Sequence, residues 1–137
     1  MRLPTTDHVP AATVRFWALL DTGVLSLALP FTAPLFLSGL YWLNGLLGGA
    51  STPPPLDPLA LFFVNLSGVM VLVWIAARLL HPVGVLALID TVGRLLVSAL
   101  IAYYVLVEGA IPVLWLFVGT ELAGAIAQGR AVLRRPS

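Results

Sequence analysis

Two aspartates lie in nearly the same apolar phrase, Asp21 in ALLDTG (residues 18–23) and Asp90 in ALIDTVG (residues 87–93). A third carboxylate, Glu121, interrupts a later apolar run. An ionised side chain facing hydrocarbon costs about 2.5 kcal/mol or more, so charged residues inside apolar runs commonly bind ions, protons or substrates. The chemistry to consider is therefore ion pairing, proton exchange or general acid–base catalysis.

Arginines are available to pair with these acids. Asp90 and Arg94 are four residues apart, which places them on one face of a helix and lets them pair directly. Arg15 and Arg78 lie nearer the ends of apolar runs and can extend toward water or reach inward. Three acids with three arginines approach the neutrality that an apolar site requires. Glu121 has no basic residue three or four positions away, so it must pair with another helix or stay protonated.

The remaining polar residues in the apolar runs extend this layer. On a helix, Ser98 follows Asp90 and Arg94 at four-residue spacing and therefore lies on their face. Glu121 and Gln128 share a face in the same way, with small residues between them that let helices approach closely. The candidate ligand- or proton-binding residues are Asp21, Asp90, Arg94 and Glu121, and the candidates for a secondary polar track are Ser26, Asn65, Ser98 and Gln128. The alternative is a structural role, because buried ion pairs can simply fix helix register.

We expect no metal, no cofactor and no nucleic-acid partner. The sequence has no cysteine, and His8 and His81 are far apart and outside the apolar runs, too sparse for a zinc site. The glycines of LNGLLGGAS lack the lysine and following helix of a phosphate-binding loop. All seven basic residues are arginine, and most lie at the ends of apolar runs rather than clustered on a wettable face.

The composition places the candidate residues inside a membrane. The chain has 137 residues, 60% hydrophobic and 9% charged, against about 45–50% and about 25% in soluble domains. We predict an all-α integral membrane protein, a single membrane domain over residues 1–137 that forms a four-transmembrane-helix bundle. A span needs about 20 mostly apolar residues, and the predicted spans are approximately 14–40, 58–80, 83–107 and 111–128.

The first predicted span has two special features. Pro30 and Pro34 predict a tilt or kink, because a proline removes a backbone hydrogen bond and crowds the preceding turn. The residues before it include acid and proline and lack the charged region and cleavage pattern of a secretory signal. We therefore expect this first span to be retained in the protein.

The arginines predict the orientation of the spans. They precede the first span, end the second and follow the fourth, whereas the loops after the first and third spans offer only Asp57 and Glu108. The positive-inside rule then makes both termini and the central loop cytoplasmic. Counting from that side places Asp21, Asp90 and Glu121 about 10 Å inside the same boundary. Arginine without any lysine is associated with GC-rich bacterial genomes, so we expect a bacterial inner membrane.

Three functions are compatible with this sequence. In the first, which the sequence favours because the chain has minimal loops and no soluble domain, it is an accessory or assembly subunit that docks onto a larger membrane complex through its acid and arginine layer. In the second, it is a proton- or ion-coupled small-molecule transporter, and four helices per chain then imply a homo-oligomer. In the third, it is an intramembrane enzyme that modifies a lipid or isoprenoid, with Glu121 and Asp90 as general acid and base. No nucleophile, metal set or phosphate loop is visible, so the sequence favours a non-enzymatic role among membrane lipids, with a protein partner or further copies of the chain.

Overall fold

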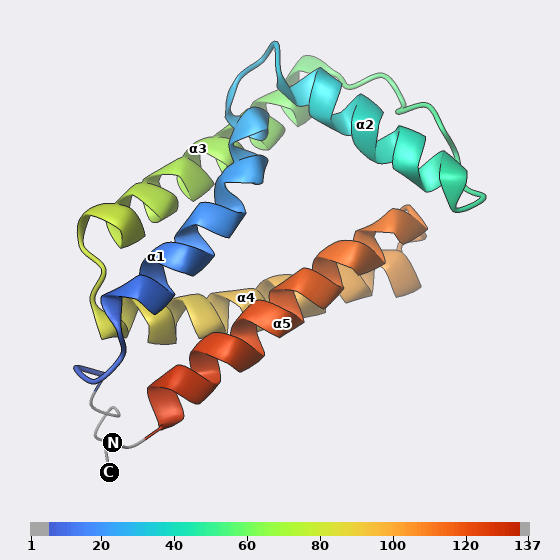
Figure 1. Cartoon of the computed structure of the whole chain (residues 1–137). Helices are drawn as coiled ribbons and strands as arrows, with labels where there is room; N and C mark the ends of the chain where they lie inside the picture. The colour runs from blue at the N-terminus through green and yellow to red at the C-terminus, as the bar shows by residue number, and fades with distance from the viewer. Residues whose placement is uncertain (1–5, 135–137) are drawn as a thin grey trace.

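The computed structural model describes residues 6–134, which are helical and contain no strand. Three segments are long and apolar enough to cross a membrane, Ala11–Ala28, Pro58–Leu80 and Gly84–Leu106. The elements in chain order are α1 (Ala11–Leu20), the 3-10 helix η1 (Asp21–Ala28), α2 (Ala33–Leu46), α3 (Pro58–Leu80), α4 (Gly84–Leu106), the short 3-10 helix η2 (Pro112–Leu114) and α5 (Trp115–Leu133) (Figure 1). The prediction of a helical chain with membrane-type apolar helices is confirmed.

The stretch predicted as one kinked span, residues 14–40, is divided into two helical segments, α1 continued by η1 and, after a break, α2. The helical backbone ends at Leu29, which is extended with φ −114° and ψ 135°. Leu29 precedes Pro30, and a residue before proline is disfavoured from helical geometry by contact with the proline ring. The next helix starts at Ala33 with Pro34 in its first turn, where a proline costs no hydrogen bond. The two prolines therefore end one helix and begin another.

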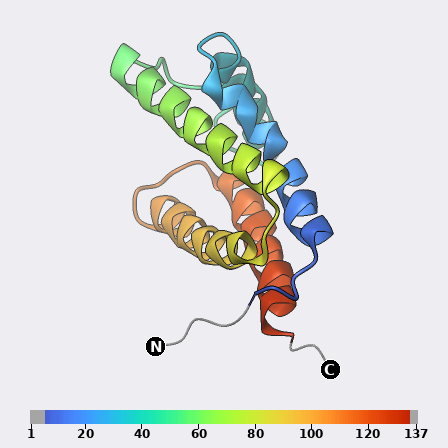
Figure 2. The same ribbon diagram turned by 90° about the vertical axis from the view of Figure 1, so that its left-hand side faces the viewer.

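The helices form two layers that meet at one end of the molecule and diverge toward the other (Figures 1 and 2). In the first layer α1 and η1 pack against α3, and in the second α4 packs against α5. The layers meet where α1 begins, α3 leads into α4, and α5 ends. At the far end, α2 runs from the first layer to the second and contacts η2 (Figure 1). The space between the layers is thus bounded by helices from both and by α2.

A glycine lets α3 approach η1 at backbone distance. A Cβ on Gly68 would lie 2.3 Å from the Ala28 nitrogen and 2.5 Å from the Leu27 carbonyl carbon, so no larger residue fits without displacing the backbone. One turn earlier, Asn65 Nδ2 donates a hydrogen bond to the Leu27 carbonyl at 2.8 Å. This bond satisfies a carbonyl close to the end of η1, where the helical hydrogen bonds run out. Asn65 and Gly68 therefore hold the first layer together.

Asn44 fixes α2 to the second layer. The residue is fully buried, and its Nδ2 donates to the Ala50 carbonyl at 3.0 Å. Its Oδ1 accepts a hydrogen bond from the Val113 backbone N–H at 3.1 Å. One side chain thus connects the end of α2, the loop that follows it and η2. Sequence analysis did not identify this residue.

The chain before α1 closes the end where the layers meet. His8 Nε2 lies 3.1 Å from the carbonyl oxygens of both Ala131 and Val132, near the last turn of α5. Buried apolar side chains form a small core at this end of the molecule: Val9, Val14, Ala87 and Val132. The ends of α1, α4 and α5 are therefore joined by a common core.

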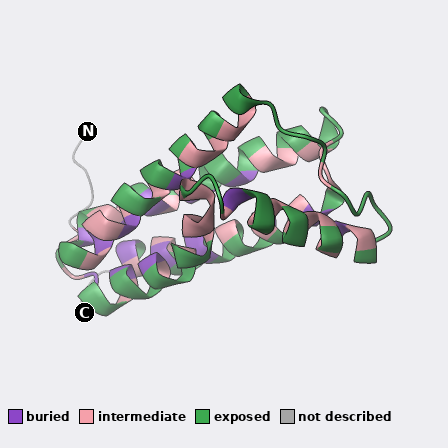
Figure 3. Ribbon diagram, turned by 90° about the horizontal axis from the view of Figure 1, so that it is seen from above, coloured by how far each residue is buried: buried purple, intermediate pink, exposed green. Residues whose placement is uncertain are grey.

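The outward faces of the helices are strongly apolar. Buried residues are few and lie mainly where helices face one another (Figure 3). Large hydrophobic side chains on the outside include Phe62, Phe63 and Met70 on α3, each more than half exposed. Exposed apolar surface on this scale is unfavourable in water. It is the surface that contact with hydrocarbon requires.

Candidate ligand-binding site

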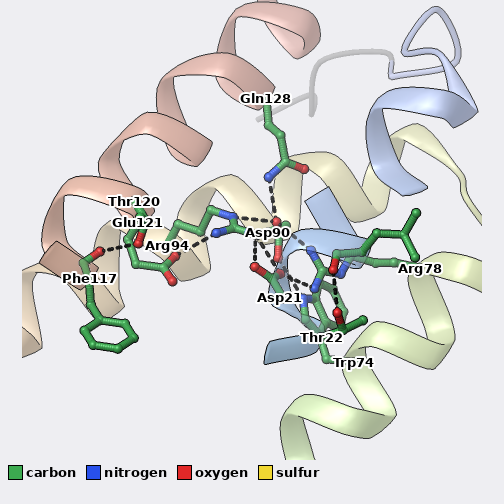
Figure 4. Close-up of polar contacts among 11 residues, drawn as sticks. Asp21, Thr22, Trp74, Arg78, Asp90, Arg94, Phe117, Thr120, Glu121 and Gln128 are labelled. Atoms are coloured by element: carbon green, nitrogen blue, oxygen red, sulfur yellow. Dashed lines mark hydrogen bonds and ion pairs between the residues drawn. The ribbon is translucent and has the colours of Figure 1, made fainter. Parts of the chain in front are cut away.

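Arg94, on α4, joins three carboxylates from three elements (Figure 4). Its Nε donates to Asp90 Oδ2 at 2.9 Å, as the four-residue spacing predicted. Its Nη2 lies 2.7 Å from Asp21 Oδ2, and its Nη1 donates to Glu121 Oε2 at 3.0 Å. Charge-assisted bonds of this kind are about twice as strong as neutral ones. Glu121 therefore has the partner on another helix that its sequence context required.

Asp90 is the most completely bonded carboxylate of the site. Its Oδ2 accepts from Arg94 and from Gln128 Nε2 at 2.6 Å, and it lies 2.9 Å from Arg78 Nη1. Its other oxygen accepts from Trp74 Nε1 at 2.7 Å. The residue is 5% exposed. A buried carboxylate of this kind is stable because several donors replace its lost water.

Arg78, on α3, completes the set, and we call Asp21, Arg78, Asp90, Arg94 and Glu121 the ion-pair cluster. Arg78 Nη2 donates to Asp21 Oδ2 at 2.5 Å, and the arginine side chain is 1% exposed. Asp21 is thereby bound by two guanidinium groups, one from each layer. The cluster links α3 and the α1–η1 junction to α4 and α5.

Two tryptophans and a glycine shape the surroundings of the arginines. The Arg78 guanidinium carbon lies 5.4 Å from the centre of the Trp74 ring, and that of Arg94 lies 5.3 Å from the centre of the Trp17 ring. Both distances are within the range of cation–π attraction. On α5, a Cβ at Gly124 would lie 2.8 Å from Arg94 Cδ. Gly124 therefore gives Arg94 the room to reach Glu121 one turn away on the same helix.

The charge balance differs from the expected three acids and three arginines. Arg15 is exposed and makes no ion pair among residues 6–134, because the α1 surface on which it lies is not the surface that faces the other helices. With all side chains ionised, the cluster combines three carboxylates and two guanidiniums and has a formal charge of −1. Within the described part of the chain no group donates to Glu121 Oε1, and the Glu121 side chain is 22% exposed.

The predicted secondary polar track is only partly connected to the cluster. Gln128 bonds Asp90, as described above, but Ser26 donates to the Gly23 carbonyl at 3.1 Å and Asn65 donates to Leu27. Both of these bonds are made to backbone carbonyls in the first layer. Ser98 is buried, and its hydroxyl has no partner within residues 6–134. Among the described residues, no hydrogen bond joins any two of these four side chains.

From its position in the sequence Arg78 could extend toward water or reach inward, and Trp74 was not among the candidate residues. Their spacing could have identified them as a pair, because Trp74 and Arg78 are four residues apart and share a helix face. That face also contains Val71, which lines the same cavity. A tryptophan N–H and a guanidinium on one face of an apolar helix indicate a buried acceptor on a facing helix.

A cavity of about 520 Å³ opens beside the cluster. All five cluster residues line one part of it, and most of the rest is apolar. The apolar lining comes from both layers and from α2, with Leu27, Phe36, Leu40, Val71, Val97 and Phe117 among its residues. Small-molecule sites in proteins are typically about 300–1,000 Å³, mostly apolar, with a few converging polar groups. The cavity has these properties.

The donor set does not suit a metal ion. Among the described residues no group of three or more histidine, cysteine, aspartate or glutamate side chains is placed to hold one. The carboxylates of the cluster are instead occupied by guanidinium groups. The arrangement can bind a molecule whose polar end contacts the cluster and whose apolar part fills the remaining cavity.

No family model, curated protein or solved structure matches the chain.

Proposed function

We propose that the chain binds an amphipathic small molecule in this cavity and transports it across a bacterial inner membrane as a homo-oligomer. The observation that supports the proposal is the cavity itself, which combines a charged end with apolar walls inside a membrane-type helical chain. An amphipathic molecule matches both parts. The cavity lies between two layers that are joined at one end, so a change in the angle between the layers would alter access to it.

We further propose that the chain crosses the membrane four times with both termini in the cytoplasm. The arginine distribution supports this orientation. Besides the three segments that qualify by length and hydropathy, α5 has 19 residues, which span about 28 Å at helical rise, close to the thickness of a hydrocarbon core. With 14 residues, α2 reaches only about 21 Å. It would lie at the outer boundary of the membrane, where its residues Phe36, Leu37 and Leu40 line the cavity.

The accessory-subunit hypothesis becomes the alternative because the polar and small residues that could dock a partner already contact other residues of this chain. Five of the six cluster carboxylate oxygens already accept bonds from this chain's own side chains, namely Asp21 Oδ1 and Oδ2, Asp90 Oδ1 and Oδ2, and Glu121 Oε2. The small residue Gly124 is covered by Arg94. Catalysis is third, since Glu121 and Asp90, its two candidate groups, both bind the same guanidinium.

Filling the cavity tests the proposal. Gly93 lines the cavity, and a Cβ at this position meets nothing within 4 Å. We therefore expect Gly93→Leu to fold normally, to weaken the binding of radiolabelled 1-octanol and octyltrimethylammonium in lipid nanodiscs at least ten-fold, and to abolish octyltrimethylammonium uptake into proteoliposomes.

Gly119→Leu is the matched control. Gly119 lies on α5, is exposed, and is equally open to a Cβ, but it does not line the cavity. This variant should bind and transport the probes like the parent protein. Equal binding by the two variants, or no saturable binding by the parent protein, would contradict the proposal. A membrane protein co-purifying at equal stoichiometry would then support the accessory role.

A further inference from the structure

We propose that the molecule in the cavity has a cationic head group, an amine or ammonium, which binds at Glu121 while its hydrocarbon part lies along the apolar walls. This inference rests on the proposed function and specifies its ligand. The formal charge of the cluster favours a cation. With all its side chains ionised, the cluster has three carboxylates against two guanidiniums, so one negative charge is without a countercharge. A monovalent cation would bring the site to neutrality.

The unbalanced negative charge lies at Glu121. Asp21 and Asp90 each lie within ion-pair distance of both Arg78 and Arg94. Among the described residues, Arg94 is the only cation that pairs with Glu121, through Oε2 at 3.0 Å. Its Oε1 accepts no bond from residues 6–134, and its side chain lines the cavity. A cationic head group in the cavity would find the least neutralised carboxylate there.

The site disfavours an anionic head group. All three nitrogens of Arg94 already donate to carboxylates. Arg78 Nε and Nη1 have no hydrogen-bond partner among the described residues, but the side chain is 1% exposed and Asp21 and Asp90 lie against it, with Nη1 2.9 Å from Asp90 Oδ2. An anion would thus approach a site that already has a formal charge of −1 and arginines that are occupied. Trp74 and Phe117 also line the cavity, and aromatic faces attract cations.

The same geometry couples the ligand to a proton. The charged groups around Glu121 are Asp21 from the α1–η1 junction, Arg78 from α3, and Asp90 and Arg94 from α4. With Glu121 protonated, the cluster is neutral and the site for a cation is lost. Proton and cation would therefore exclude one another, which is the condition for exchange of one for the other across a membrane.

The test compares three probes with the same eight-carbon tail in lipid nanodiscs: octyltrimethylammonium, 1-octanol and octanesulfonate. The parent protein should bind the cation at least ten-fold more tightly than octanol, and the sulfonate most weakly. Glu121→Gln keeps the shape of the side chain and removes its charge. It should lose the preference for the cation and leave octanol binding unchanged.

Glu108→Gln is the control with the same chemical change. Glu108 lies outside the cavity, where its Oε1 accepts a hydrogen bond from the Tyr103 hydroxyl, and this variant should retain the preference. If Glu121→Gln does not fold, Glu121→Asp serves instead, because withdrawing the carboxylate by one methylene should weaken cation binding and leave octanol binding unchanged.

The results distinguish failure of the cationic head group from failure of the proposed function. Equal binding of cation and octanol by the parent protein, with both lost in Gly93→Leu, would overturn the cationic head group and leave the cavity as a binding site. Binding of no probe by the parent protein, or of every probe by Gly93→Leu, would overturn both. A cation preference that persists in a folded Glu121→Gln variant would remove Glu121 from the site.

Discussion

Arg94→Met is expected to destabilise the folded protein by about 3–5 kcal/mol, the cost of leaving buried charges without their partner. Arg94 pairs with all three carboxylates of the cluster, and methionine keeps much of the side-chain length without the charge. Three carboxylates would then face Arg78 alone. The measurement is the free energy of unfolding in mild detergent or bicelles, followed by the loss of helical circular dichroism.

Arg15→Met is the control for this prediction, because Arg15 is exposed and outside the cluster. It should change the unfolding free energy by less than about 0.5 kcal/mol, as surface substitutions usually do. Adding Asp21→Asn and Glu121→Gln to Arg94→Met removes the unpaired charges and should recover part of the lost stability. An Arg94→Met protein as stable as the Arg15→Met control would show that the ion pairs do not hold the two layers together.

Gly68→Ala is expected to cost about 1–3 kcal/mol, the range for overpacking a close contact. The added Cβ would lie 2.3 Å from a backbone nitrogen of η1, and backbone atoms cannot move aside as a side-chain end can. The helices must separate, which also lengthens the Asn65 to Leu27 hydrogen bond. The expected readout is a lower unfolding temperature together with faster amide exchange in η1.

Gly119→Ala gives the comparison for Gly68→Ala, since its Cβ meets nothing within 4 Å. Replacing an interior helical glycine by alanine is otherwise favourable by about 0.5–1 kcal/mol, so this variant should be neutral or more stable. A Gly68→Ala protein that is equally stable or more stable would contradict the close approach of the α3 and η1 backbones.

The parts of the site that follow from helical periodicity could be predicted from the sequence. The pairing of Asp90 with Arg94 needs only a continuous helix, because four residues bring both side chains to one face. Counting residues from the ends of the apolar runs predicted that Asp21, Asp90 and Glu121 lie at one level of the helices. The structure brings these three carboxylates to one arginine.

The parts that depend on packing between helices could not be predicted. Whether Arg15 or Arg78 turns inward depends on how α1 and α3 are rotated in the first layer, and apolar residues on every side of a membrane helix conceal that rotation. The cavity depends on the angle between the two layers and on the placement of α2. That placement follows from the end of the helix before Pro30 and from the two hydrogen bonds of Asn44.

The most direct test of the central claim is native mass spectrometry of the protein released from its own membranes. The parent protein and Gly119→Leu should each retain one small amphipathic molecule per chain, and Gly93→Leu should lack it because leucine occupies the same space. The same molecule at the same stoichiometry in Gly93→Leu, or a parent protein that leaves the membrane only with an equimolar partner chain and no small molecule, would contradict the account.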